Sequence, residues 1–156
     1  MILWILLKLI ILWILYAITA SLCWGMSYAA SGPLLKKGVS PLVFLLGYSL
    51  VGFVGAFLTL FCSAQIPLIT RLTSFSRSDI GWFFFSISGS ALGAYLTYAA
   101  MGARNPTLVS LIEISYPLFV VLFAWIFFRE IQLSPATLFG GLLVLTGVIV
   151  IILGER

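Results

Sequence analysis

The sequence contains no histidine and few charged residues. Charged side chains make up 8% of the 156 residues and hydrophobic side chains make up 63%, whereas soluble globular domains usually carry about 25% charged and about 45–50% apolar residues. The absence of histidine disfavours His/Cys metal sites and histidine-based acid, base or nucleophilic catalysis. The composition predicts an all-α integral membrane protein, whose first partner is the lipid bilayer.

Cysteine is also scarce. Cys23 and Cys62 both fall inside apolar segments, where a free thiol behaves as a small hydrophobic group. The sequence therefore supports no disulfide, and we expect no metal ion and no cofactor. The net charge of +4 comes from residues that lie mostly at the ends of apolar runs. Such charges are typical of interfacial positions, so nucleic acid is not an expected partner.

Five apolar segments with short polar connections predict five transmembrane helices in a single domain, residues 1–156. A hydrocarbon layer of about 30 Å needs about 20 helical residues, which each segment supplies. The expected spans are approximately 9–30, 41–64, 80–101, 106–128 and 135–153. The short loops favour a multi-pass protein of a bacterial inner membrane.

Prolines and capping residues predict the helix ends. Pro33 is expected to end the first helix, and Ser40 and Pro41 to begin the second as an N-cap followed by a first-turn proline. Ser78 or Asp79 is expected to cap the third span.

The fourth segment, Pro106 to Phe128, contains one formal charge, Glu113. At a rise of about 1.5 Å per residue, Glu113 lies roughly 10 Å from the Pro106 end. An ionisable group at that depth costs about 2.5 kcal/mol or more on insertion scales, so it should face a protein interior or a wet cavity. Pro117 removes a backbone donor and is expected to kink the helix near that face. Together these residues predict a binding site.

Ser110, Glu113, Tyr116 and Pro117 fall on one face of this helix. The hypothesis for Glu113 is proton coupling or cation binding; the alternative is a structural carboxyl group that is hydrogen-bonded to a neighbouring helix. Tyr116 would donate to the carboxylate or to a substrate, or would only pack. Weaker candidates for substrate contact, with lipid-facing or packing roles as their alternative, are Trp24, Tyr28 and Tyr95.

Small residues predict close helix packing in two spans. Gly89 and Gly93 belong to a small, weakly polar stripe on the third span, which either admits another helix or lines a pathway. Gly140 and Gly147 in the last span are also expected to serve packing.

Short motifs occupy the second half of the sequence: Asn105-Pro106-Thr107, Tyr116-Pro117-Leu118-Phe119, Arg129-Glu130, Ser134-Pro135, Gly140-Gly141 and Gly147. With Trp24-Gly25 near the end of the first helix, they resemble an EamA-type repeat of the drug/metabolite transporter (DMT) superfamily. The resemblance implies a transporter that exports or exchanges small metabolites or amphipathic compounds by alternating access.

The usual member of that superfamily has ten helices in two oppositely oriented repeats, with the substrate cavity between them. The resemblance here covers one repeat, which implies a partner: a second copy in a homodimer, parallel or inverted, or a second related five-helix half. Four basic residues fall on one side, Lys36, Lys37, Arg104 and Arg156, and three on the other, Arg71, Arg77 and Arg129, joined by Lys8 if the first helix starts there. Counted in that way the basic residues divide four against four, which would permit an inverted copy.

The alternative function is a non-transporting membrane accessory or assembly subunit. A membrane-embedded enzyme is disfavoured, because no nucleophile, base and orienting group occur together at spaced positions.

Overall fold

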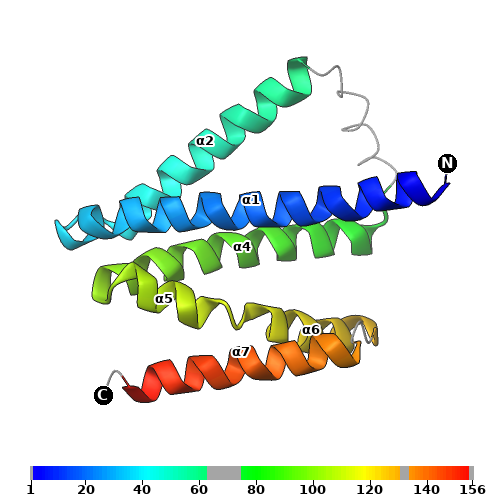
Figure 1. Ribbon diagram of the computed structural model, residues 1–156. Helices are drawn as coiled ribbons and strands as arrows, with labels where there is room; N and C mark the ends of the chain where they lie inside the picture. The colour runs from blue at the N-terminus through cyan, green and yellow to red at the C-terminus, as the bar shows by residue number, and fades with distance from the viewer. Residues whose placement is uncertain (1, 63–74, 131–133, 155–156) are drawn as a thin grey trace. The chain divides into compact units, whose positions relative to one another are not determined.

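The computed structural model describes residues 2–62, 75–130 and 134–154, with the side chains of 2–11 and 13 left out. Every regular element among these residues is an α-helix (Figure 1). The helices are α1 (Ile2–Lys36), α2 (Pro41–Cys62), α4 (Arg77–Ala103), α5 (Pro106–Glu113), α6 (Tyr116–Phe128) and α7 (Pro135–Gly154). The prediction of an all-α protein is confirmed.

Four segments among the described residues are long and apolar enough to cross a membrane. They are Pro41–Cys62, Arg77–Ala103, Pro106–Phe128 and Pro135–Gly154. The remaining predicted span, 9–30, lies inside α1, which has 35 residues. Large apolar side chains are exposed along these helices, as expected of a chain whose solvent is lipid.

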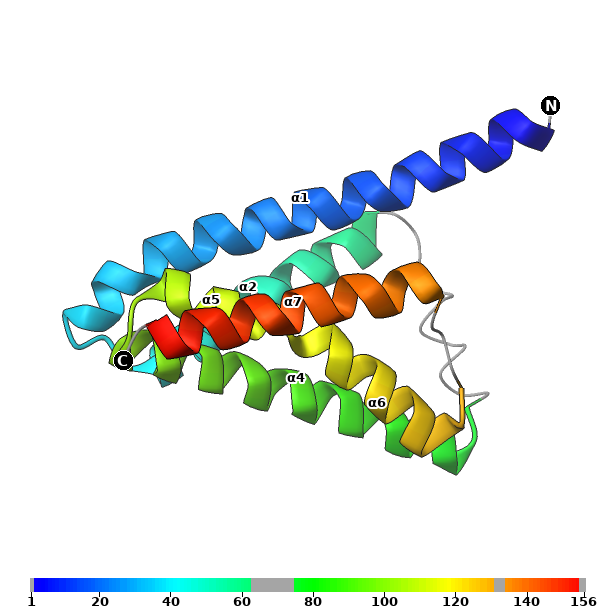
Figure 2. The same cartoon turned by 60° about the horizontal axis from the view of Figure 1, so that its bottom comes forward.

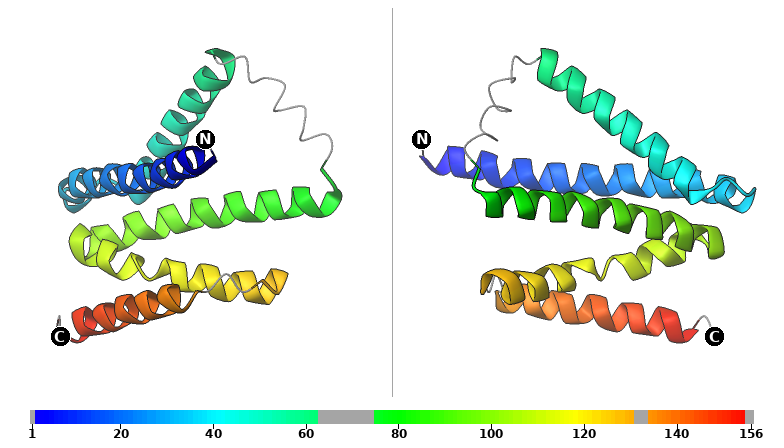
Figure 3. Two further views of the ribbon diagram at one scale, coloured as in Figure 1. Left: turned by 45° about the vertical axis from the view of Figure 1, so that its right-hand side comes forward. Right: turned by 180° about the vertical axis from the view of Figure 1, so that it is seen from behind.

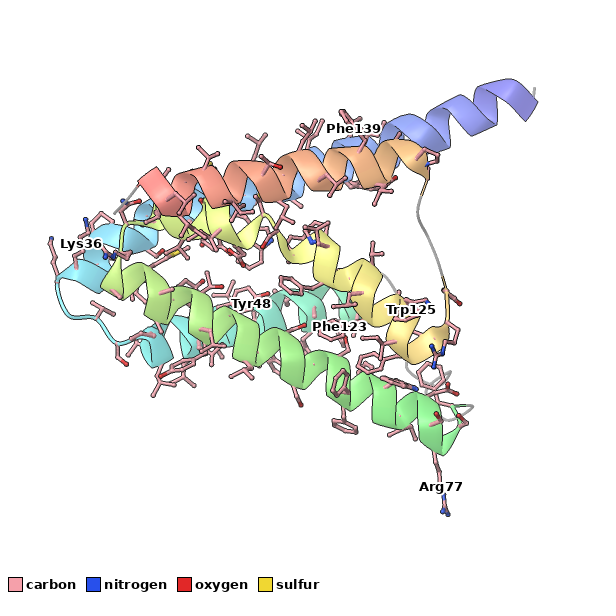
Figure 4. All side chains as sticks on the ribbon, turned by 90° about the horizontal axis from the view of Figure 1, so that it is seen from below. Lys36, Tyr48, Arg77, Phe123, Trp125 and Phe139 are labelled. Carbon is pink, nitrogen blue, oxygen red and sulfur yellow. The ribbon has the colours of Figure 1, made fainter. Side chains whose placement is uncertain are left out.

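The chain divides into two compact units, Gly32–Ala103 in one and Met1–Ser31 with Arg104–Arg156 in the other. In the first, Phe44 of α2 stacks on Tyr98 of α4, with ring centroids 5.2 Å apart. Among the described residues of this unit, the buried apolar side chains are Leu35, Tyr98 and Met101. Its core therefore lies where the end of α1, the start of α2 and the end of α4 meet. Figure 4 shows Lys36 near this end of α4 and Arg77 at the far end.

The prediction that Pro33 ends the first helix is wrong, because α1 continues through it to Lys36. A proline removes only its own N–H donor, and the next turn still forms, with the Lys37 N–H donating to the Pro33 carbonyl at 3.2 Å. The helix ends where Gly38 adopts φ 91°, and the Val39 N–H closes the turn on the Leu34 carbonyl at 3.2 Å. This is a Schellman motif, which glycine permits at low steric cost.

The predicted cap of the third span is also wrong. α4 begins at Arg77, and Ser76 is its cap, because Ser76 Oγ accepts from the Asp79 N–H at 3.2 Å. Asp79 Oδ2 accepts in return from the Ser76 N–H at 2.9 Å and from its hydroxyl at 2.7 Å. Asp79 thus completes a capping box one turn after the cap and is not the cap itself.

In the second unit, α7 begins with Ser134 as its cap, whose Oγ accepts from the Thr137 N–H at 3.1 Å. α7 then packs closely on α5. Figure 3 shows α7 running back beneath α5 and α6, opposite to them in direction.

Candidate functional site

The fourth span is interrupted near its middle. α5 ends at Glu113 and α6 begins at Tyr116, so Ile114 and Ser115 form a turn between them (Figure 1). Both residues keep a helical φ, but their ψ is −11°, whereas an α-helix has ψ near about −42°. We call the segment from Glu113 to Tyr116 the break.

Pro117 gives the break a local cause. In a regular helix residue 117 would donate its N–H to the Glu113 carbonyl, but proline has no N–H and its ring crowds that carbonyl. Ser115 instead forms a tighter turn, with both its N–H, at 3.1 Å, and its hydroxyl, at 2.8 Å, donating to the Ile112 carbonyl. The Leu118 N–H then donates to the Ser115 carbonyl at 3.0 Å. Sequence analysis predicted a kink at Pro117, and the interruption lies immediately before it.

The start of α5 fixes how deep the break lies. Asn105 caps this helix, with its Oδ1 accepting from the Leu108 N–H at 2.7 Å, and Pro106 occupies the first turn. From Pro106 to Ile114 the chain rises about 12 Å, which is close to the centre of a hydrocarbon layer of about 30 Å.

The break concentrates hydrogen-bond acceptors. Glu113 is half-buried and stands at the carboxyl end of α5, where helix carbonyls carry partial negative charge. Its own carbonyl lacks the usual donor four residues on, because that position is Pro117. A carboxylate beside such carbonyls suits a cation, a protonated amine or a proton.

Ser110, Glu113 and Tyr116 follow one another at steps of three across the end of α5 and the break. The Ser110 hydroxyl donates to the Thr107 carbonyl at 2.9 Å, which leaves its oxygen lone pairs for a donor. Tyr116 is 61% exposed at the start of α6, so its ring is open to a ligand or another chain. The functional role of these three residues remains a prediction.

The aromatic candidates fall in different units. Trp24 and Tyr28 of α1 form a pair, with ring centroids 5.4 Å apart and planes tilted by 50°. Trp24 is 41% exposed and Tyr28 is half-buried. Tyr95 lies on α4, in the unit Gly32–Ala103, and is half-buried there. Their substrate role also remains a prediction.

One close approach was missed by sequence analysis. A Cβ atom built on Gly141 would lie 2.9 Å from Leu118 Cδ2, whereas a Cβ on Gly140 would meet nothing within 4 Å. The same open space surrounds Gly89, Gly93 and Gly147. The Gly140-Gly141 pair was the available signal, but α7 is apolar on all sides and its sequence does not tell which glycine faces a neighbour.

Among the residues that the structure describes, no three His, Cys, Asp or Glu side chains are grouped so that they could hold a metal ion. Glu113 is the one formal charge of the span Pro106–Phe128.

Fold and site together define a multi-pass helical membrane protein with an interrupted span that carries one carboxylate. Residues 11–153 match the model of the EamA-like transporter family, and the chain belongs to that family. This confirms the DMT-type resemblance and the membrane fold class, and the family is one of transporters, not of enzymes. No curated protein and no solved structure matches the chain.

Proposed function

We propose that this protein moves a small organic molecule across the membrane by alternating access, with the break as part of its substrate site. The observation that carries the proposal is the interruption of Pro106–Phe128 beside Glu113, the one formal charge of that span. Secondary transporters commonly form midplane sites from discontinuous helices, whose free backbone groups contact the substrate or coupling ion. An uninterrupted span would not point to a site in this way, because a continuous apolar helix can simply anchor a protein in the membrane.

The acceptors at the break favour a substrate with a positive or hydrogen-donating group. Glu113 can hold either a proton or such a group, but not both at once, so the two would compete for one carboxylate. Tyr116, Trp24, Tyr28 and Tyr95 offer rings for stacking or cation–π contact. We therefore propose export or exchange of a metabolite or amphipathic compound, with Glu113 as the residue that couples it to protons.

A second five-helix unit would complete the transport pathway. Alternating access usually depends on two repeats that rock around a shared site, and the family match covers one such unit. We propose a homodimer, in parallel or inverted arrangement, or pairing with a related half, and the balanced distribution of basic residues is compatible with an inverted copy. The proposed location is a bacterial inner membrane.

Flux measurements in liposomes test the coupling role. The purified chain is reconstituted with an internal pH dye and challenged with a panel of amines, amphipathic cations and neutral metabolites. We expect compound-driven proton movement that falls at least about tenfold in Glu113→Gln, and Glu113→Asp should retain part of it. Glu130→Gln, which alters a carboxylate at the end of α6, is the matched control and should transport normally.

Two results would contradict this function. Flux with an unchanged pH dependence in Glu113→Gln would remove the coupling role. Absence of flux for every compound, together with stable association with another membrane protein, would favour the alternative of a non-transporting accessory subunit.

Orientation and pairing need a separate measurement. Single cysteines at Lys36 and Arg77, which lie at opposite ends of their unit in Figure 4, are introduced after Cys23 and Cys62 are replaced. An inverted homodimer predicts that each cysteine is labelled from both sides of the membrane and that copies crosslink. One-sided labelling would leave a parallel assembly or a different partner.

A further inference from the structure

In the first turn of α6, the Leu118 side chain contacts α7 at Gly141. Leu118 follows Pro117 directly, and its Cδ2 atom occupies the space that a Cβ on Gly141 would enter, at 2.9 Å. Both residues are half-buried. In Figure 2 the start of α6 lies near α7, and the rest of α6 diverges from α7 toward its C-terminal end.

The side chains of α7 show why Gly141 faces this crossing. Phe139 points away from α6 in Figure 4, and a residue two positions further along a helix projects about 200° around it. Gly141 therefore lies on the face toward α6, while Gly140 does not. The absence of a side chain at Gly141 permits this close approach, and a Cβ atom there would press on the end of the Leu118 side chain.

The Leu118 contact is linked to the break by the backbone. The Leu118 N–H donates to the Ser115 carbonyl at 3.0 Å, so a shift of Leu118 away from α7 pulls on the turn. On the other side of the break, α5 also packs on α7. Both halves of the interrupted span, α5 and α6, therefore contact α7.

We propose that Gly141 is a positioning residue for the break: its missing side chain lets Leu118 rest on α7, and this contact sets where Ser115 and Glu113 lie. The transport consequence rests on the function proposed above. The structural consequence, a defined geometry at the break, does not depend on it.

The contact predicts a graded response to side-chain size. An alanine at 141 meets only the end of a flexible leucine, which can rotate away, so its effect should be small. A valine projects further and forces the first turn of α6 off α7. The neighbouring Gly140 supplies the matched control, because a Cβ atom there meets nothing within 4 Å.

The experiment compares Gly141→Ala, Gly141→Val, Gly140→Ala and Gly140→Val in the purified full chain in lipid nanodiscs. Hydrogen exchange is measured at the Ser115 and Leu118 amides, next to flux in liposomes. We expect Gly141→Val to speed exchange at these amides by about tenfold or more, because the turn opens more often. Gly141→Ala should change it by less than about threefold, and both Gly140 variants should match the parent protein.

A compensating substitution separates positioning from general damage. Leu118→Ala removes the atom that a valine at 141 would meet, so the double variant Gly141→Val/Leu118→Ala should return most of the way to the parent exchange rate. If Gly141→Val does not fold, the pair Gly141→Ala and Gly141→Ala/Leu118→Val gives the same comparison at smaller amplitude.

Equal effects at Gly140 and Gly141, or no recovery in the double variant, would overturn the inference. Failure of the proposed function looks different: exchange would respond to Gly141→Val as expected, but no variant and no parent protein would show flux. Conversely, unchanged exchange in Gly141→Val with flux still abolished by Glu113→Gln would leave the function and remove the positioning role.

Discussion

α4 and the α5–α6 pair are two spans of similar length, 27 and 23 residues, but only the second is interrupted. α4 contains Gly89 and Gly93, which are poor helix formers, and it still forms one continuous helix. The α5–α6 span contains Pro117. A missing backbone donor therefore interrupts a span here, whereas flexible residues do not.

The two spans also use their serines differently. In α4 the Ser90 hydroxyl donates to the Ser86 carbonyl four residues back, at 3.0 Å, and the helix continues. At the break the Ser115 hydroxyl donates to Ile112 three residues back, at 2.8 Å, and tightens the turn. The serine bond of α4 is thus compatible with a continuous helix, whereas the Ser115 bond belongs to the tighter turn that follows Glu113.

The largest effect is expected from interrupting the continuous span, α4. Leu92→Pro places a proline in the middle of α4, where it removes a helix hydrogen bond and crowds a carbonyl. We expect a loss of about 3 kcal/mol or more in the free energy of unfolding. The measurement is the yield of monodisperse protein and its denaturation in detergent. A variant that is as stable as the parent would show that α4 tolerates a break.

The reverse substitution should join α5 and α6. Pro117→Ala restores an N–H donor for the Glu113 carbonyl, and alanine is the best helix former. We expect slower hydrogen exchange at Ser115, no loss of stability and flux reduced about tenfold. Unchanged flux with a closed break would contradict a functional role for the interruption.

The helix start of α4 allows a smaller test. Ser76→Ala removes the capping oxygen and should cost about 1 kcal/mol in thermal or denaturant unfolding. Ser78→Ala, two residues on, is the control and should remain within about 0.5 kcal/mol of the parent. Equal losses at both positions would contradict the capping box.

The smallest expected effect concerns the end of α6. Arg129 adopts φ 58°, a conformation that costs a non-glycine residue about 1 kcal/mol. Its guanidinium lies 5.5 Å from the Trp125 ring centroid, and this cation–π contact stabilises the folded protein by about 0.5–1 kcal/mol. Arg129→Gly loses both terms, so its unfolding free energy should differ by less than about 0.5 kcal/mol. Arg129→Ala keeps the strain and should be the less stable of the two.

Sequence reasoning reached the fold class because an apolar, nearly charge-free chain must form helices whose backbone groups are bonded internally. It also identified Glu113 as the one formal charge of the fourth span and Pro117 as the position of the disturbance, which the structure places immediately before that proline. It was wrong about Pro33, because a proline only one turn from a helix end leaves that last turn intact. Proline thus leaves the helix continuous at Pro33 and interrupts it at Pro117, and its position within the helix decides which of the two occurs.

Two further features were beyond sequence reasoning for different reasons. Ser76 was overlooked as the cap, because Asp79 carries the stronger capping signal and its role as the return partner is visible only from the hydrogen bonds. Gly141 was not separated from Gly140, because a helix that is apolar on all sides has no polar face to fix its rotation.

The most direct test of the account compares two serines that both bond to their own helix. In a variant without Cys23 and Cys62, Ser115→Cys at the break and Ser90→Cys in α4 are treated with a small water-soluble thiol reagent in membranes. We predict that the cysteine at 115 reacts at least about tenfold faster, because non-helical backbone at membrane depth that lines a transport pathway borders water, and that transported compounds protect it. Equal reaction rates, or a faster reaction at 90, would contradict the break as the substrate site and would favour α4 as the lining of the pathway.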